Sequence, residues 1–231
     1  MSATVPVVLY GHWICPYVVR VQFALAQRSI EYDFVEVPPT AVRPKQFVMP
    51  EEFLAHSPKR EVPMLRIGNA FLADSIPILE WMEREFAEFP MLPPSAEAAA
   101  RVRERVQWLD QHLYRPMIGI YYGTDEARIQ SASVRFGEAL GEVARWLSET
   151  RWLGGNGVTL AEAIMAAIYV RVDGLRSLGL NAALPAVVED HHRRCTALPG
   201  WRAVAWSESQ TREFVKRFTK YRELSISAQC E

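Results

Sequence analysis

The sequence predicts a small α/β domain followed by an all-helical domain. In residues 1–88 the hydrophobic period changes repeatedly, in the order strand, helix, strand, hairpin and helix. Residues 89–95, Phe-Pro-Met-Leu-Pro-Pro-Ser, carry three prolines and are expected to link the two domains. Residues 96–231 show a helical period throughout. A chain of 231 residues has room for both domains.

The expected first domain is a βαβ unit followed by a β-hairpin and a helix. Val5–Tyr10 is an apolar, β-branched run, which is typical of a buried strand. Pro16 suits the first position of a helix, and residues 32–37 alternate as in a strand with one buried face. Strands that are joined through a helix run parallel. Residues 64–72 predict an antiparallel hairpin with a tight turn.

The expected second domain is a set of helices. Residues 96–122 place apolar side chains on one stripe and predict one long helix, and residues from about 128 to 149 predict a second. Thr159-Leu160-Ala161-Glu162 is a capping box that opens a strongly apolar helix. Shorter helices are expected over residues 184–196, 199–207 and 211–221.

The charge balance and the cysteine count narrow the class of protein. Lys and Arg total 26 and Asp and Glu total 27, so the net charge of −1 argues against broad binding to nucleic acid or to an anionic membrane. The cysteines Cys15, Cys195 and Cys230 are few and odd in number, which favours a reducing compartment. No apolar run has the length of a membrane span, and no basic start of a signal peptide is visible. A cytoplasmic protein is therefore expected.

Cys15 is the residue with the clearest chemical signal. It falls between the first strand and the first helix, where backbone N–H groups and the helix dipole favour the thiolate over the thiol. The alternative is a small buried residue with a structural role. Val18, and not a second cysteine, completes the Cys-x-x-Val spacing. A lone thiol forms no internal disulfide, so redox chemistry would need a small thiol cosubstrate.

Two dipeptides could bind such a cosubstrate. A cis peptide bond at Val62-Pro63 would leave the backbone of Val62 free to pair with an extended ligand, and the alternative is a trans proline that starts an edge strand. Ser75 at a helix start can bind an anion, and Asp74 beside it can bind a cation. Together they suit an α-amino, α-carboxylate group, and the alternative is simple helix capping.

In this order, the features resemble the cytosolic glutathione transferases. The resemblance covers nearly the whole chain and is most specific over residues 8–90. It implies a thioredoxin-like first domain, glutathione as cosubstrate, no metal and a homodimer. It also implies that Val62 and the cis-proline Pro63 hold the cysteinyl part of glutathione, while Asp74 and Ser75 hold its γ-glutamyl group.

The cysteine indicates which chemistry to expect within that superfamily. Cys15 in Cys-Pro-Tyr resembles the omega and lambda classes and the dehydroascorbate reductases, which implies glutathione-dependent thiol transfer and reduction. The alternatives are conjugation of glutathione to hydrophobic electrophiles and a non-catalytic binding module. Met49 stands where the omega pattern has a glutathione-contacting lysine, so the alternatives are that Lys45 or Lys59 replaces that lysine or that no residue does. The tau pattern is also similar, and an unclassified bacterial member fits both observations.

A pocket for a small electrophilic or disulfide substrate is expected between the domains. The alternative for most of its residues is an ordinary role in the core. His191-His192 with Cys195 is expected on a solvated helix face rather than at a metal. The candidate pocket residues are Trp13, Tyr17, Tyr114 and Ile118.

Overall fold

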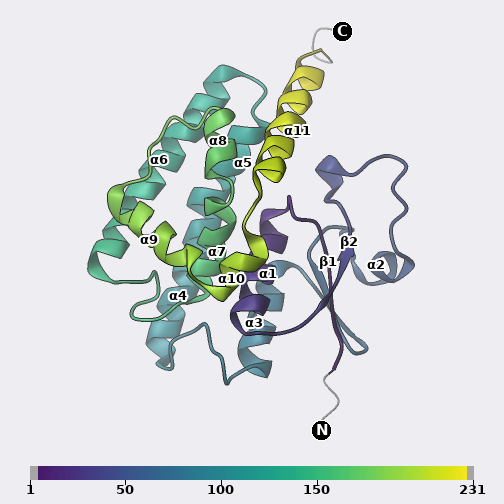
Figure 1. Cartoon of the computed structure of the whole chain (residues 1–231), viewed down its shortest axis with the longest axis vertical. Coiled ribbons are helices and arrows are strands. Elements are labelled where there is room, and N and C mark those ends of the chain that lie inside the picture. Colours follow the sequence, from purple (N-terminus) through teal and green to yellow (C-terminus); the bar gives the residue numbers. More distant parts are fainter. Residues whose placement is uncertain (1–4, 228–231) are drawn as a thin grey trace. The chain divides into compact units, whose positions relative to one another are not determined.

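The structure is a computed structural model that describes residues 5–227. The chain divides into two compact units, of which the first takes the chain up to Met91 together with Leu198–Val204. The second takes Leu92–Ala197 and the chain from Ala205 onward. The first is an α/β unit and the second is all-helical, so the predicted fold class is confirmed (Figure 1). The boundaries expected at residues 88 and 96 stay a prediction.

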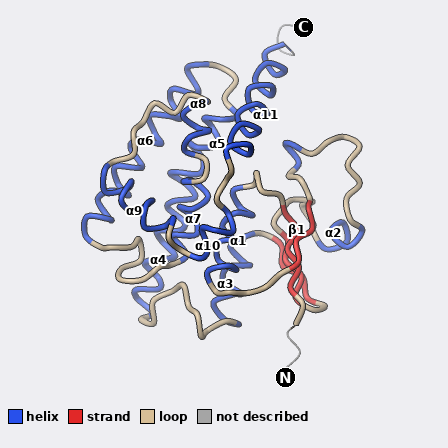
Figure 2. Tube along the Cα trace, in the orientation of Figure 1, coloured by secondary structure: helices blue, strands red, loops and turns tan. Residues whose placement is uncertain are grey.

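The first unit is built on one mixed sheet with the strand order β2-β1-β3-β4. β1 pairs parallel with β2 and antiparallel with β3, and β3 and β4 form the predicted hairpin. Gly68, with φ of 54°, makes the turn between them. Figure 2 shows the four strands side by side. They are β1 (Val7–Gly11), β2 (Asp33–Glu36), β3 (Met64–Ile67) and β4 (Ala70–Ala73).

β1 is buried along its whole length because it lies inside the sheet. Its last residue, Gly11, allows the close approach of helix α1 (Pro16–Gln27). A Cβ atom at Gly11 would lie 2.5 Å from Cγ1 of Val18, so a larger residue would push the helix away. The start of α1 is thereby held against the end of β1.

β2 does not have the buried face that its alternating sequence predicts. Asp33, Phe34 and Glu36 are exposed and Val35 is half-buried, so that expectation is wrong. β2 lies at the edge of the sheet, where its apolar side chains are not covered as those of β1 are. The apolar residue that is fully buried here is Val37, one position beyond the strand.

Helices lie on both sides of this sheet. Figure 1 shows α1 and α3 (Ser75–Glu85) on one side and α2 (Glu51–His56) on the other. A short helical turn, η1 (Thr40–Val42), lies between β2 and α2. α10 (Pro199–Val204), far along the chain, packs against α1 and belongs to this unit.

The second unit begins with a helix that is interrupted once. The expected single helix over residues 96–122 is wrong in its middle, because α4 (Ala96–Leu109) and α5 (Arg115–Tyr122) are separated by η2 (Asp110–Tyr114). η2 is a π-helical turn. Pro116 has no N–H to donate to the preceding turn, which accounts for the wider turn at this point.

All ten residues of α7 are buried, and this helix packs against α4 and α9. The sequence did not predict α8, which is a short helix of six residues, and α11 is longer than expected. No helix among residues 5–227 combines the length and the apolarity needed to cross a bilayer. The elements are α6 (Glu126–Glu149), α7 (Leu160–Tyr169), α8 (Val172–Ser177), α9 (Ala186–Thr196) and α11 (Glu208–Ser227).

Candidate functional site

Cys15 occupies the N-cap position of α1. Its backbone is extended, with φ of −80° and ψ of 120°, and Pro16 follows as the first helical residue. Its carbonyl oxygen accepts hydrogen bonds from the N–H groups of Val18 and Val19, at 3.2 and 3.1 Å. The side chain is 4% exposed. The thiol therefore lies at the positive end of the α1 dipole and is largely shielded from bulk water.

The thiol meets the backbone just before a cis peptide bond. The Val62-Pro63 bond is cis, as the resemblance implies. Sγ of Cys15 donates to the carbonyl oxygen of Val62 at 3.7 Å. The expectation that the N–H and the carbonyl of Val62 are both free is wrong for the carbonyl, because it accepts the hydrogen bond from the Cys15 thiol. The N–H of Asp74 donates to the carbonyl oxygen of Pro63 at 3.2 Å, which ties the two dipeptides together.

Asp74 has a backbone conformation that is uncommon outside glycine. Its φ is 70° and its ψ is 141°, and its side chain makes no capping hydrogen bond to α3. Simple capping by Asp74 is therefore ruled out. Ser75, the first residue of α3, is 4% exposed. The hydroxyl of Ser75 and the first N–H groups of α3 together form a place where a carboxylate can bind.

Lys59 is the cation at this corner of the unit. Its Nζ lies 2.9 Å from Oδ2 of Asp74, and this hydrogen bond raises the pKa of Lys59. Both side chains are largely exposed, so the pair contributes little to stability. Of the two lysines considered in place of Met49, Lys59 is thus in contact with Asp74.

The predicted pocket residues fall in different units. In the first, Trp13 stacks on His12 with ring centroids 5.5 Å apart, and Tyr17 lies 4.7 Å from the Arg20 guanidinium. In the second, Tyr114 is 1% exposed and its hydroxyl donates to the carbonyl oxygen of Ile164 at 3.1 Å. Ile118 lines a hollow of about 460 Å³ beside α6. A substrate pocket shared by these residues stays a prediction.

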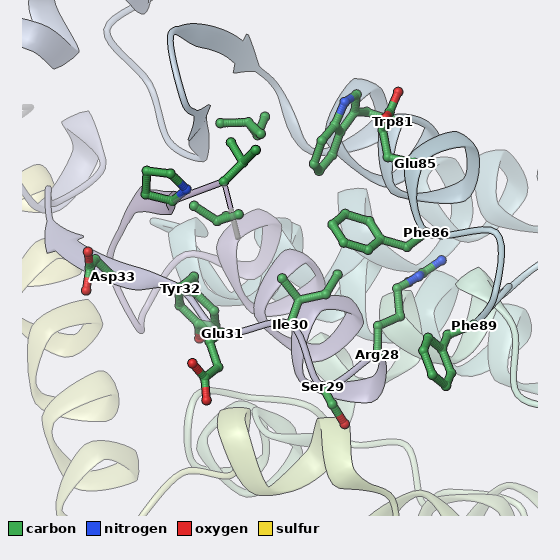
Figure 3. A pocket seen from close by; sticks show the side chains of 14 residues that line it. Arg28, Ser29, Ile30, Glu31, Tyr32, Asp33, Trp81, Glu85, Phe86 and Phe89 are labelled. Carbon is green, nitrogen blue, oxygen red and sulfur yellow. The ribbon is translucent and has the colours of Figure 1, made fainter. Parts of the chain in front are cut away.

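A larger hollow of the first unit, about 1260 Å³, lies elsewhere. It lies near the start of β1 and the end of α3. Figure 3 shows Trp81 and Phe86 on the opposite side of it from Tyr32. None of the predicted site residues lines it. Arg28, at its floor, is buried and paired with Glu83, and burial lowers the pKa of Arg28 to about 10.

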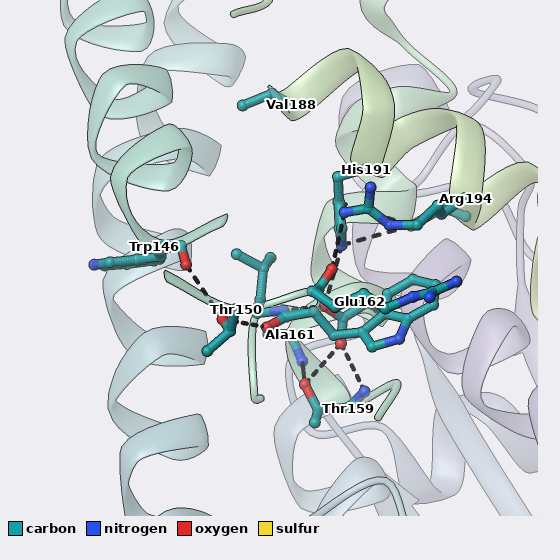
Figure 4. A network of polar contacts seen from close by, with 12 residues as sticks. Trp146, Thr150, Thr159, Ala161, Glu162, Val188, His191 and Arg194 are labelled. Carbon is teal, nitrogen blue, oxygen red and sulfur yellow. Dashed lines mark hydrogen bonds and ion pairs between the residues drawn. The ribbon is translucent and has the colours of Figure 1, made fainter. Parts of the chain in front are cut away.

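A buried polar network in the second unit extends the predicted capping box (Figure 4). Oε2 of Glu162 accepts from the N–H and the hydroxyl of Thr159, at 2.6 and 2.7 Å. Oε1 accepts from the N–H of Leu153 at 2.6 Å and lies 3.2 Å from Nε2 of His191. Nδ1 of His191 lies 2.8 Å from the hydroxyl of Tyr169. Glu162 therefore joins three segments of the chain.

This network corrects the expectation for the residues of α9. His191 and Cys195 are fully buried and do not lie on a solvated face. Burial raises the pKa of the Cys195 thiol well above its ordinary value, so this thiol is held protonated. Within residues 5–227, no group of three or more His, Cys, Asp or Glu side chains could hold a metal ion. Cys230 lies outside the described residues.

Sequence reasoning missed the partners that orient these groups. Glu36, which contacts His12, and the Val62 carbonyl, which accepts from Cys15, were not anticipated. Neither contact has a local sequence signal, because each joins residues more than twenty positions apart.

The chain is similar to several known proteins. Residues 9–90 match the family model "Glutathione S-transferase, N-terminal domain". Glutathione S-transferase 3 of Zea mays is 27% identical over 171 residues, covering 68% of this chain and 74% of that protein. A tau-class glutathione S-transferase from Mangifera indica aligns with a TM-score of 0.77 at 20% identity, over 92% of this chain and 98% of that one. Glutathione transferase Omega 3C from Trametes versicolor also aligns with a TM-score of 0.77 at 20% identity, over 96% of this chain and 92% of that one.

The fold and the site define a thioredoxin-like unit with a thiol at a helix start, followed by a helical unit. Residues 9–90 are therefore similar to the N-terminal domain of glutathione S-transferases, and the maize relative carries the same name. The tau and omega structures have the same TM-score and identity, so they distinguish no class and show the fold alone.

Proposed function

We propose that this chain is a glutathione-dependent thiol transferase with Cys15 as its nucleophile. The observation that carries the proposal is the thiol of Cys15 at the N-cap of α1, hydrogen-bonded to the carbonyl before cis-Pro63. The positive end of a helix dipole favours the thiolate, which is the form that attacks disulfides. Val18, where a dithiol site would have its second cysteine, is buried and cannot be oxidised to a disulfide.

In the proposed reaction, glutathione supplies the electrons. The Cys15 thiolate attacks one sulfur of a disulfide, forming a mixed disulfide and releasing the other sulfur as a thiolate that takes up a proton. A glutathione thiolate then attacks the Cys15 sulfur of the mixed disulfide, which releases the second substrate thiolate and leaves Cys15 disulfide-bonded to glutathione. A second glutathione thiolate attacks the glutathione sulfur of that disulfide, which releases glutathione disulfide and restores the Cys15 thiolate. Two glutathione molecules are oxidised to one glutathione disulfide, and the substrate disulfide is reduced to two thiols.

The binding residues proposed for glutathione flank the β3–β4 hairpin, and one of them, Val62, contacts Cys15. Val62 would pair with its cysteinyl backbone beside Pro63. Asp74 would hold its α-amino group, and Ser75 with the start of α3 would hold its α-carboxylate. The N–H of Asp74 on the Pro63 carbonyl supports this assignment, since it sets the spacing between the two binding points.

The second candidate function is conjugation of glutathione to a hydrophobic electrophile. It is favoured by the maize relative, which is named a glutathione S-transferase. In that case the site would position the glutathione thiol beside the electrophile, and Cys15 would not form a covalent bond. A homodimer and a cytoplasmic location belong to either proposal and stay predictions.

Two parallel assays separate the candidates. Reduction of hydroxyethyl disulfide and conjugation of chlorodinitrobenzene are measured for the wild type, for Cys15→Ser and for Cys195→Ala. Thiol transfer predicts disulfide reduction that is lost in Cys15→Ser and kept in Cys195→Ala, whose thiol is buried. Conjugation that survives in Cys15→Ser, without disulfide reduction in the wild type, would favour the second candidate. Glutathione binding with neither activity would indicate a binding module.

A further inference from the structure

The residues between β1 and α1 form a turn that is held by its first residue. The N–H of Cys15 donates to the carbonyl oxygen of His12 at 3.0 Å, which is the closing bond of a β-turn. Within the turn, the N–H of Ile14 donates to Nδ1 of the His12 ring at 3.1 Å. His12 therefore accepts two of the N–H groups in the segment that carries the thiol.

The imidazole of His12 is itself held by the neighbouring strand. Glu36 of β2 pairs in register with Gly11, which directly precedes His12. Nε2 of His12 lies 3.3 Å from Oε1 of Glu36, and His12 is 5% exposed. Because Nδ1 accepts from Ile14, the ring proton is carried by Nε2, which donates it to Glu36. Both ring nitrogens are thereby used in orienting the turn.

We propose that His12 is a positioning residue for Cys15, an inference that rests on the proposed function. By holding the N–H of Ile14, the ring sets the direction of the chain as it enters Cys15 and so holds this residue at the N-cap of α1, where the helix dipole favours the thiolate that alkylation needs. An acceptor two residues before an N–H is the geometry of an Asx-turn. Asparagine can therefore replace His12 in this contact, and alanine cannot.

The test compares His12→Ala with His12→Asn. The rate of Cys15 alkylation by iodoacetamide is measured at neutral pH, with peptide mass mapping to separate Cys15 from the other two cysteines. We expect alkylation of His12→Ala to slow by about tenfold, and that of His12→Asn to stay within about threefold of the wild type. In disulfide reduction, kcat should fall in parallel while KM for glutathione changes by less than about twofold, since its proposed binding residues lie on other elements.

His56→Ala is the matched control. His56 is a second imidazole of the same unit, at the end of α2, and it stacks on Phe71 with ring centroids 3.7 Å apart. Its loss should leave the alkylation rate unchanged. Should His12→Ala fail to fold, Glu36→Leu replaces it, because Glu36 is exposed and its loss removes the partner of Nε2 of His12. We then expect alkylation to slow by about threefold in Glu36→Leu.

Two results would overturn the proposal. One is a folded His12→Ala protein that alkylates at the wild-type rate. The other is a His12→Asn protein as slow as His12→Ala, with both unfolding at the wild-type temperature. Alkylation needs no glutathione, so it is independent of the proposed function. If the wild type does not reduce disulfides, the proposed thiol transfer is refuted. If the alkylation rates of the His12 variants still follow the expected order, the positioning role of His12 holds.

Discussion

The thiol of Cys15 and the carbonyl oxygen of Val62 are hydrogen-bonded at 3.7 Å. A thiolate has no proton to donate, so this bond ends when the thiol loses its proton. Under the proposed function, the same carbonyl accepts an N–H of glutathione. The thiol therefore occupies one of the two lone pairs of this carbonyl oxygen and weakens it as an acceptor for the ligand, and forming the thiolate releases that lone pair.

Removing the competing thiol should strengthen ligand binding. We expect Cys15→Ala to bind S-methylglutathione about two- to tenfold more tightly than the wild type, which corresponds to one hydrogen bond of about 0.5–1.5 kcal/mol. Isothermal titration calorimetry measures the difference. Cys195→Ala, which changes a buried thiol of the other unit, should bind as the wild type does. Weaker binding by Cys15→Ala would mean that the thiol assists the ligand.

Asp74 and Lys59 form one ion pair but should affect binding differently. Asp74→Asn removes the charge proposed to hold the α-amino group, so we expect KM for glutathione to rise about tenfold with kcat little changed. Lys59→Met removes an exposed partner, and we expect a change of less than about threefold. Steady-state kinetics with varied glutathione tests both variants. An equal rise of KM for glutathione in both variants would show that binding depends on the Asp74–Lys59 ion pair and not on the Asp74 carboxylate alone.

Ser75 and Ser95 both stand at helix starts and should behave oppositely. Oγ of Ser95 accepts from the N–H of Ala98 and caps α4, so Ser95→Ala should cost about 1 kcal/mol of stability and leave KM unchanged. Ser75→Ala should raise KM for glutathione about fivefold and cost less stability, because no side chain caps α3. Thermal unfolding measures the stability of the two variants, and steady-state kinetics measures their KM for glutathione. A stability loss in Ser75→Ala without a change in KM would contradict the assignment.

Glu162 should be the most sensitive residue of the second unit. Glu162→Ala leaves the N–H groups of Leu153 and Thr159 without the acceptor that Glu162 provides. We therefore expect the free energy of unfolding to fall by roughly 3–5 kcal/mol. Glu162→Gln keeps one oxygen, so the loss should be roughly 1–3 kcal/mol. Chemical denaturation followed by circular dichroism measures both. The exposed Glu149→Gln is the control, with a change within about 0.5 kcal/mol. A Glu162→Gln protein as stable as the wild type would refute the role of the network.

Cys195 should make the stability depend on alkaline pH. Burial raises its folded-state pKa well above that of the unfolded thiol, which is about 8.5. The folded state therefore holds a proton that the unfolded state releases, so this contribution is present below pH of about 8.5 and is lost as pH rises toward the folded-state pKa. Thermal midpoints from neutral to alkaline pH should fall more steeply for the wild type than for Cys195→Ala. Parallel curves would refute the prediction.

Several features of the fold were predictable because their signals are local. The switch from strand to helix at Pro16, the hairpin turn at Gly68 and the capping box at Thr159 each depend on neighbouring residues. The burial of β2 was predicted wrongly from its alternation, because the pattern does not show that the strand lies at an edge. The long helix was predicted without its interruption, although Pro116 marks the place.

The α/β and helical division, the order of most elements and the position of Cys15 at a helix start were predictable from the sequence alone, because periodicity and capping depend on adjacent residues. Which side chains contact one another depends on the tertiary structure. The contacts of Cys15 with Val62, of His12 with Glu36 and of Glu162 with His191 join residues that are far apart in sequence. Such contacts depend on how packed elements bring their side chains together, and no local pattern specifies them.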